Sequence, residues 1–273
     1  MLTKVEIYNA QGALLSLPLQ DVSGGYVVKD ISGLDPVKAS IVTSPFAKMN
    51  GVLYQASNKG ERNLIFKIGM DPILGTSSVS VRRSNLYRFF MPEAEITIRF
   101  FDDDALFVTI QGRVESFDAP LFTKDPEATI SILCLDPDFI APSSTTINGF
   151  TVADQTDRYV LYPGSVESGF VFNLFVDRSV SEFTIQNLTA ANRPFSLSFV
   201  ASLVAGDTVT ITTISGQKSA KLTRANVTSS ILTGVSPSSS WLGLYPGLNK
   251  IRVSTSGTPI PFSIEYFARY GGL

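Results

Sequence analysis

Histidine is absent from this 273-residue sequence, and cysteine and tryptophan occur once each. Without histidine, the chain lacks the commonest general base, the commonest metal ligand and every Ser-His or Cys-His nucleophile pair. The lone cysteine, Cys134, excludes an internal disulfide and a zinc site built from thiolates. Only chemistry based on carboxylates, lysine or tyrosine remains open to an enzyme, so we expect no catalytic, metal or cofactor site.

Long hydrophobic runs and strong charge are also missing. The apolar runs are short, as at residues 170–176, whereas a membrane-spanning helix needs roughly 20 apolar residues. Glu6 stands where a signal peptide would be apolar. Basic and acidic residues number 22 and 24, for a net charge of −2, and a dedicated nucleic-acid surface needs clustered Lys and Arg. We expect neither a membrane partner nor a stable nucleic-acid complex, and no secretion signal.

Alternation of apolar and polar residues is the dominant pattern. It is clear at residues 96–100 (ITIRF), 195–199 (FSLSF) and 209–212 (VTIT), and turn signals rich in Gly, Pro, Ser and Asn separate such segments. A period of two is typical of half-buried strands. Strands at regular spacing, without helices between them, favour sandwiches or barrels over βαβ units.

Residues 78–90 break this pattern and predict a single helix. A helix here places apolar side chains on one side, namely Val79, Leu86, Phe89 and Phe90. It places three arginines on or near the other side, namely Arg82, Arg83 and Arg88. Pro92 ends the segment because proline cannot continue a helix.

The best domain boundary follows the strand-like sequence that stops at residues 135–139 (LDPDF). Residues 141–147 are rich in Ser and Thr after a proline, as linkers are. We therefore predict a mainly β chain. Its first domain, residues 1–140, is a β-barrel or sandwich with one α-helix, and its second, residues 148–273, is a β-sandwich. The sequence leaves open whether the last strand, within residues 263–270, completes the second domain or returns to the first.

Two groups of carboxylates invite a functional interpretation. Asp102, Asp103 and Asp104 would suit a hard cation, but three consecutive side chains cannot all point at one ion, and Asp favours turns. A hairpin turn is the preferred interpretation. Glu115 and Asp118 would suit an acid/base pair of the kind that glycosidases use, but their spacing shows no cleft, so a solvated or ion-paired face is preferred.

Aromatic residues of the second half offer a different kind of site. Trp241, Tyr162, Tyr245 and Tyr266 have ring faces that could stack on a sugar, although the same residue types are ordinary in cores and interfaces. A carbohydrate-binding sandwich for host recognition, with Trp241 and Tyr245 as stacking residues, is therefore kept as an alternative function. A hydrolase that uses carboxylates ranks last, because no nucleophile elbow is present. Cys134 lies among apolar residues and is expected to be a buried, inert thiol.

A series of short motifs carries a family resemblance. In the first half they are residues 33–36 (GLDP), 60–64 (GERNL), 84–90 (SNLYRFF), 112–116 (GRVES) and 132–139 (ILCLDPDF). In the second half they are residues 162–164 (YPG), 216–219 (GQKS) and 241–249 (WLGLYPGLN). In order and spacing this series resembles the phage distal tail proteins (Dit), the siphovirus-type tail component family, over nearly the whole chain.

The resemblance implies a structural virion protein. It implies an N-terminal β-domain with one helix that closes into a hexameric ring, and a C-terminal galectin-like or jelly-roll sandwich that points outward. Such a ring joins the tail tube protein to the hub proteins of the tail tip or baseplate and leaves a channel for transient DNA passage. The implied location is the virion tail, after assembly in the cytoplasm of the bacterial host.

One segment is a candidate for the ring interface. Residues 50–62 have mixed polar composition and glycine near both ends, which predicts a protruding hairpin arm. Edge strands that pair between neighbouring copies lose their exposed edges when a ring closes. We therefore predict four ring-interface residues, Asn50, Tyr54, Asn58 and Arg62.

Overall fold

The computed structural model shows a chain made mostly of β-strands. It describes residues 1–19, 21, 24–47, 50–71, 77–121, 123–151, 157–189 and 195–273. These form two compact units, the first comprising Met1–Pro142 with Tyr270–Leu273 and the second comprising Ser143–Arg269. The described part of the chain holds one α-helix, so the prediction of a mainly β fold with one helix is confirmed.

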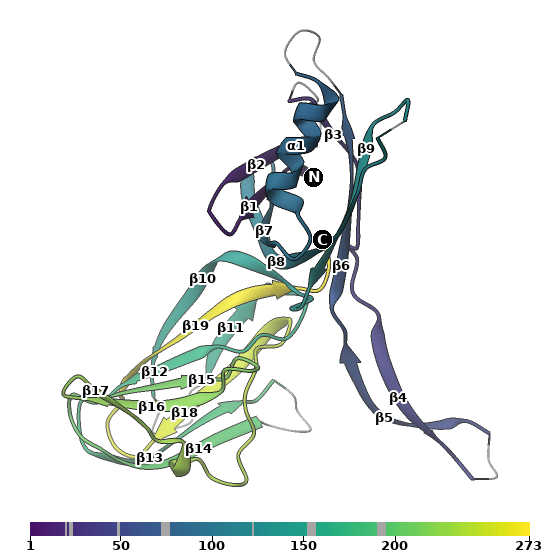
Figure 1. Ribbon diagram of the computed structural model, residues 1–273. Coiled ribbons are helices and arrows are strands. Elements are labelled where there is room, and N and C mark those ends of the chain that lie inside the picture. The colour runs from purple at the N-terminus through teal and green to yellow at the C-terminus, as the bar shows by residue number, and fades with distance from the viewer. Residues whose placement is uncertain are drawn as a thin grey trace. The chain divides into compact units, whose positions relative to one another are not determined.

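The first unit is built on one antiparallel sheet (Figure 1). The strand order is β3-β6-β9-β8-β7-β1-β2, and the start of β10 joins β8 where Ile140 lies opposite Thr109. Because β3 and β2 end this order, the sheet is not closed into a barrel. The strands of the unit are β1 (Leu2–Asn9), β2 (Leu14–Pro18), β3 (Tyr26–Ser32), β4 (Ala39–Pro45), β5 (Val52–Lys59), β6 (Arg62–Met70), β7 (Glu95–Asp102), β8 (Ala105–Asp118), β9 (Glu127–Cys134) and β10 (Phe139–Phe150).

Alternation along these strands produces the core of the first unit. In β9, every second residue is buried, ending at Ile130, Ile132 and Cys134. The helix α1 (Val79–Phe90) packs on the sheet and contributes Leu86, Phe89 and Phe90 to the same core. Burial of each such side chain contributes roughly 1.5–3 kcal/mol.

The ends of α1 follow from its sequence. The Ser78 hydroxyl caps the first turn by accepting from the Val81 amide at 3.3 Å, and the helix stops at Phe90, before Pro92. Arg82 was expected on or near the polar side, and this is wrong. It is only 8% exposed and donates to the Gly24 carbonyl at 2.6 Å, since its own chain supplies an acceptor there. Among the described residues, no helix is long and apolar enough to cross a membrane.

The second unit is a two-sheet sandwich. One sheet has the order β17-β16-β15-β12-β19-β10 and the other β11-β18-β13-β14. Phe172 of the first sheet stacks at 6.5 Å on Phe183 of the second, so the two sheets share a core. The elements are β11 (Arg158–Tyr162), β12 (Val171–Phe175), β13 (Val180–Asn187), β14 (Phe195–Leu203), β15 (Thr208–Thr212), β16 (Ser219–Arg224), β17 (Val227–Ser230), the 3-10 helix η1 (Leu232–Gly234), β18 (Gly247–Thr255) and β19 (Pro261–Tyr270).

The chain passes between the units in continuous strands. Residues 141–147, expected to form a linker, lie inside β10. Their Thr and Ser side chains suit an extended backbone as well as a loop, and pairing of β10 with β19 supplies the hydrogen bonds that a linker lacks. The chain returns at the end of β19, where Tyr270–Leu273 belong to the first unit. The last strand, β19, therefore lies in the second unit as far as Arg269, and from Tyr270 the chain belongs to the first unit.

Candidate protein-protein interface

Strands β4 and β5 form a hairpin arm, and in the described part of the chain they pair only with each other. Their register runs from Ala39 opposite Lys59 to Pro45 opposite Val52, with an irregularity after Val42. Figure 1 shows the arm extending away from the rest of the first unit. Every residue of the two strands except Ser44 is exposed, on both faces of the hairpin.

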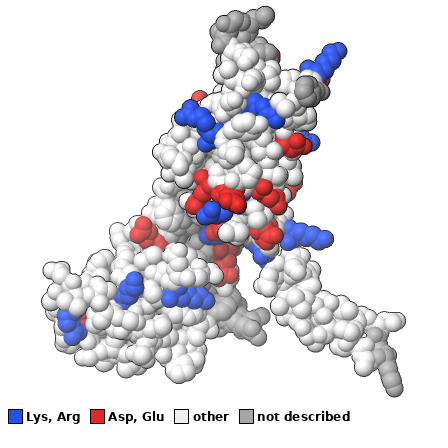
Figure 2. Space-filling view, in the orientation of Figure 1, with Lys and Arg blue, Asp and Glu red and all other residues white. Residues whose placement is uncertain are grey.

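The arm exposes apolar side chains and almost no charge. Its large exposed residues are Ile41 (62%), Val42 (46%), Val52 (58%), Leu53 (52%) and Tyr54 (60%). Lys59, at the root, is the only charged residue of the two strands, and the arm is accordingly white along its described length in Figure 2. A lone two-stranded hairpin is marginally stable in water, and contiguous exposed apolar surface marks an interaction site. The arm therefore has the composition of a segment that is buried against a partner.

Three of the four predicted interface residues lie on this arm. Asn50 lies at the turn before Gly51, Tyr54 lies opposite Thr43, and Asn58 lies opposite Ser40, all exposed. The Tyr54 hydroxyl is 2.9 Å from the Ser57 hydroxyl, which holds the ring on its own strand.

Arg62 occupies a different environment from the one predicted. It is 1% exposed, and its guanidinium donates to its own chain's carbonyls, namely Gly33, Asp35 (2.8 Å), Pro137 (2.6 Å) and Gly271 (2.6 Å). It also lies over the Phe139 ring at 4.3 Å. Burial lowers the pKa of Arg62. The prediction of a surface contact for Arg62 is therefore corrected: it supports the root of the arm from inside.

The residues that sequence reasoning missed lie on both strands of the arm, two on β4 and two on β5. Ile41, Val42, Val52 and Leu53 are apolar residues in strand-like sequence, which by itself predicts burial in a core. A signal was present in Asn50-Gly51, a pair typical of hairpin turns, and Gly51 has a φ of +106°. This pair stands directly before β5, in the connection between the two strands of the arm.

The aromatic residues of the second unit separate into two pairs. Tyr162 and Tyr266 are buried, 5.4 Å apart edge to face, so the interpretation of these two tyrosines as sugar-stacking residues is wrong. The Tyr162 hydroxyl accepts from the Arg269 amide at 2.8 Å, which gives it a structural partner. Trp241 and Tyr245 are partly exposed.

Two charged residues lie beside this second pair. The Lys218 ammonium is 5.8 Å from the centre of the Trp241 ring. Glu167 lies so close to Gly243 that a Cβ there would be 2.1 Å from its carboxylate. Partial desolvation raises the pKa of Glu167, and desolvation with the nearby Glu167 charge raises the pKa of Tyr245.

The structure places the carboxylates singled out in the sequence at a turn, in an ion pair and on an exposed strand. Asp103 and Asp104 make the two-residue turn between β7 and β8, with φ of 45° and 65°. Asp102 forms an ion pair with the N-terminal ammonium. Glu115 and Asp118 are exposed on β8, and Glu115 accepts from the Ser131 hydroxyl at 2.7 Å. No group of metal-ligating side chains large enough to hold an ion occurs in the described parts of the chain.

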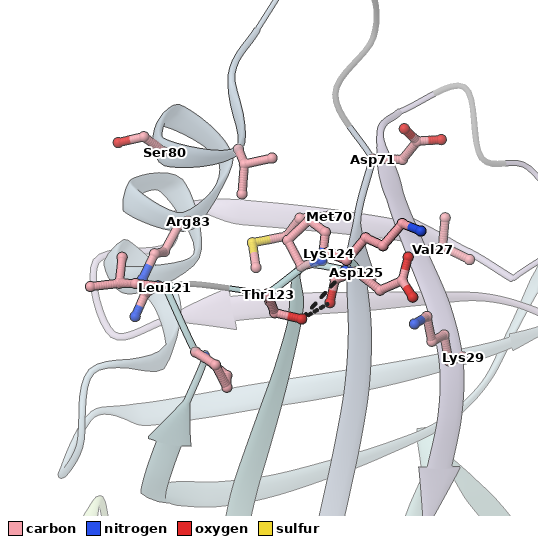
Figure 3. Close-up of a pocket in the computed structure, with 14 residues that line it drawn as sticks. Val27, Lys29, Met70, Asp71, Ser80, Arg83, Leu121, Thr123, Lys124 and Asp125 are labelled. Atoms are coloured by element: carbon pink, nitrogen blue, oxygen red, sulfur yellow. Dashed lines mark hydrogen bonds between the residues drawn. The ribbon is translucent and has the colours of Figure 1, made fainter.

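A cavity of about 720 Å³ lies in the first unit between α1, β3 and the loop before β9. Figure 3 shows Arg83 of α1 and Lys29 of β3 on opposite sides of it. Lys29 pairs with Glu127 at 2.7 Å, and Arg83 donates to the Tyr87 hydroxyl at 2.5 Å. The Lys29 and Arg83 side chains of the cavity wall are therefore bonded to other side chains of the same chain.

The fold and the arm together define a class: a two-unit, mainly β protein whose first unit carries an exposed apolar hairpin. Residues 163–270 match the model of the family described as siphovirus-type tail component, C-terminal domain. The resemblance found in the sequence is thus confirmed by the match of residues 163–270 to this family's C-terminal domain. No curated protein sequence is significantly similar to this chain.

Solved structures extend the comparison to the first unit. The crystal structure of phage SPP1 Dit (gp 19.1), described as a paradigm of the hub adsorption apparatus in phages that infect Gram-positive bacteria, is similar with a TM-score of 0.66 and 15% identity, over 97% of this chain and 98% of that one. This shows a shared fold across both units. The phage P2 baseplate in its activated conformation with Ca gives a TM-score of 0.41 at 10% identity, over 97% and 98% of the two chains. A fructofuranosidase from Schwanniomyces occidentalis gives 0.24 at 8% identity, over 97% and 65%. The last two scores are too low to indicate a shared fold.

Proposed function

We propose that this chain is a structural hub or adaptor of a phage tail and that copies of it assemble into a ring. The observation that carries the proposal is the arm, an exposed and nearly uncharged hairpin on a chain of tail-component type. The role proposed is structural and not catalytic, in keeping with the absence of histidine.

The arm supports a ring because docking of one copy's arm on a different surface of the next copy is a heterologous contact. An arm that docks on a different surface of the next copy repeats head to tail, and such a contact closes into a ring when the rotation allows. Asn50, Tyr54 and Asn58 are the proposed contact residues, together with the apolar residues Ile41 and Leu53. Tyrosine is among the residue types that dominate binding energy at interfaces.

The remaining parts of the proposal concern place and partners. We propose six copies per ring, placed in the virion tail after assembly in the host cytoplasm. The first unit would form the ring and the second unit the sandwich attached to it. The ring would join the tail tube protein to tail-tip or baseplate hub proteins and leave a lumen for DNA. The net charge of −2 suits such a lumen, because strong positive charge would retain the phosphate backbone.

Native mass spectrometry and electron microscopy of the purified protein test the ring. We expect a closed particle with six times the 29.6 kDa mass of the chain. Tyr54→Asp should weaken association at least about 30-fold, as loss of an interface hot spot does. The matched control is Val227→Asp, which changes a side chain that is 70% exposed in the second unit. A strictly monomeric protein that never enters tails, or equal association of both variants, would contradict the proposal.

A second candidate function is carbohydrate binding at the loops of the second unit. The observation that favours it is the gathering of Trp241, Tyr245, Glu167 and Lys218, which combine a stacking ring with an acceptor and donors. Binding on a glycan array should be lost in Trp241→Ala while circular dichroism is unchanged. Lack of any glycan signal for the native protein would dismiss this candidate and leave the ring proposal untouched.

A further inference from the structure

The root of the arm is bound to the end of the described chain. Arg62 follows the last residue of β5 by three positions and opens β6. Its four acceptors come from three separate stretches: Gly33 and Asp35 before β4, Pro137 before β10, and Gly271 after β19. One guanidinium thus joins segments on either side of the arm to a segment 209 residues further along the chain.

Residues 270–273 pack closely against the root of the arm. The Leu273 amide donates to the Leu34 carbonyl at 3.1 Å. A Cβ on Gly272 would lie 2.8 Å from Pro36 Cδ and 3.0 Å from the Leu34 carbonyl oxygen, so only glycine fits there without a shift of the backbone. Tyr270 packs on Phe107, with ring centres 5.6 Å apart.

The same place receives both strands of the arm. The loop of residues 33–36 leads directly into β4, and Arg62 begins the strand that follows β5. Lys59, the last residue of β5, forms an ion pair with Asp138 at 3.1 Å. Among the described residues no ion pair is made by Arg62 itself, so its position depends on the carbonyls that surround it. In Figure 1 the C-terminus lies beside β6, above the arm.

We propose that the docking of residues 271–273 onto Arg62 and the loop of residues 33–36 fixes the direction of the arm, and that ring assembly requires this docking. The inference rests on the proposed function of the arm as the contact between copies. Arg62 is then a positioning residue that touches no partner. Residues 271–273 bind at a site formed by other residues of the first unit. This binding holds the arm in the direction in which it meets the next copy. A fixed direction favours association because less conformational freedom is lost on binding.

Two variants remove the docking without touching the arm. Gly272→Val forces the segment away from Pro36 and Leu34, and deletion of residues 271–273 removes it. Glu61→Ala is the matched control, since Glu61 is exposed beside Arg62. The direction of the arm is measured by electron spin resonance between labels at Val52→Cys on the arm and Lys67→Cys on β6. Cys134 is buried and should remain unlabelled.

We expect a narrow distribution of the label-to-label distance in the doubly labelled protein without further substitution and in its Glu61→Ala variant. In both docking variants the distribution should be broad or shifted. Without the labels, both docking variants should assemble at least about 10-fold more weakly, as loss of preorganisation predicts. An unchanged distance distribution, or unchanged assembly, would overturn the inference. If Tyr54→Asp assembles normally, the proposed function fails. If Tyr54→Asp blocks assembly and Gly272→Val does not, only the docking inference is wrong.

Discussion

Replacement of Arg62 by methionine is the sharpest test of how the first unit is held together. Methionine keeps most of the side-chain length and its contact with Phe139, but it removes every donor. The carbonyls of Gly33, Asp35, Pro137 and Gly271 then lose their bonds to Arg62. A buried acceptor left without a partner costs about 1–3 kcal/mol. Partial entry of water and relief of the buried charge reduce the sum, so we expect a loss of about 3–5 kcal/mol.

The distribution of tryptophan makes the assay selective. Trp241, the only tryptophan, lies in the second unit, so its fluorescence follows that unit during urea unfolding. Hydrogen exchange at the amides of β6 and β9 follows the first unit. In Arg62→Met these amides should lose protection, while the Trp241 transition stays close to that of the native protein. The expected fall in melting temperature of the first unit is about 10 °C.

Arg113→Met supplies the matched control. Arg113 is exposed and pairs with Glu95 at 3.0 Å on the surface, where such pairs contribute less than about 1 kcal/mol. If Arg62→Met costs no more than Arg113→Met, the carbonyls around Arg62 find other donors, and the reasoning about the root of the arm is refuted.

Three other groups give measurable expectations. Hydrogen bonds from Arg252 and Lys250 lower the pKa of Asp157 to about 2. The ionised Asp157 therefore stabilises the fold fully above its unfolded pKa of about 4, and this stabilisation disappears as the pH falls through its folded pKa. In Asp157→Asn, the urea midpoint of the second unit should depend less on pH over this window. Burial raises the pKa of Cys134 to about 11, so a disulfide reagent should label the unfolded chain and leave the folded one unlabelled. Asp104→Gly, at a φ of +65°, should raise stability by about 0.5–1 kcal/mol in thermal melts, and calcium should not shift the melt of the native protein.

The local parts of the fold could be predicted from sequence because their causes are local. Alternation at residues 96–100 and 209–212 predicted strands, and these segments lie within β7 and β15, respectively. Ser78 and Pro92 marked the two ends of the helix within one or two residues. The aspartates at 103 and 104 gave a turn because their side chains tolerate positive φ.

Long-range contacts account for the errors. Arg62 is charged and stands at the start of a strand, so its composition predicts a surface position. Its burial depends on carbonyls that are 27 to 209 residues away in the chain, and no window of sequence contains them. Arg82 was placed wrongly for the same reason, since its acceptor at Gly24 is 58 residues away. Backbone carbonyls are present at every position, so they leave no signature in the sequence.

The arm and its root reverse the usual relation between polarity and burial. Ile41 and Tyr54 are exposed in a part of the first unit that has no core, while Arg62 is buried where the arm joins the sheet. A chain that functioned alone would gain from the opposite arrangement, because apolar surface in water and a guanidinium out of water both cost free energy. Both costs are offset if another copy covers the apolar strands of the arm. Arg62 then holds the arm in the direction in which it can bind that copy. The same pair of features therefore argues both for assembly and for a fixed arm.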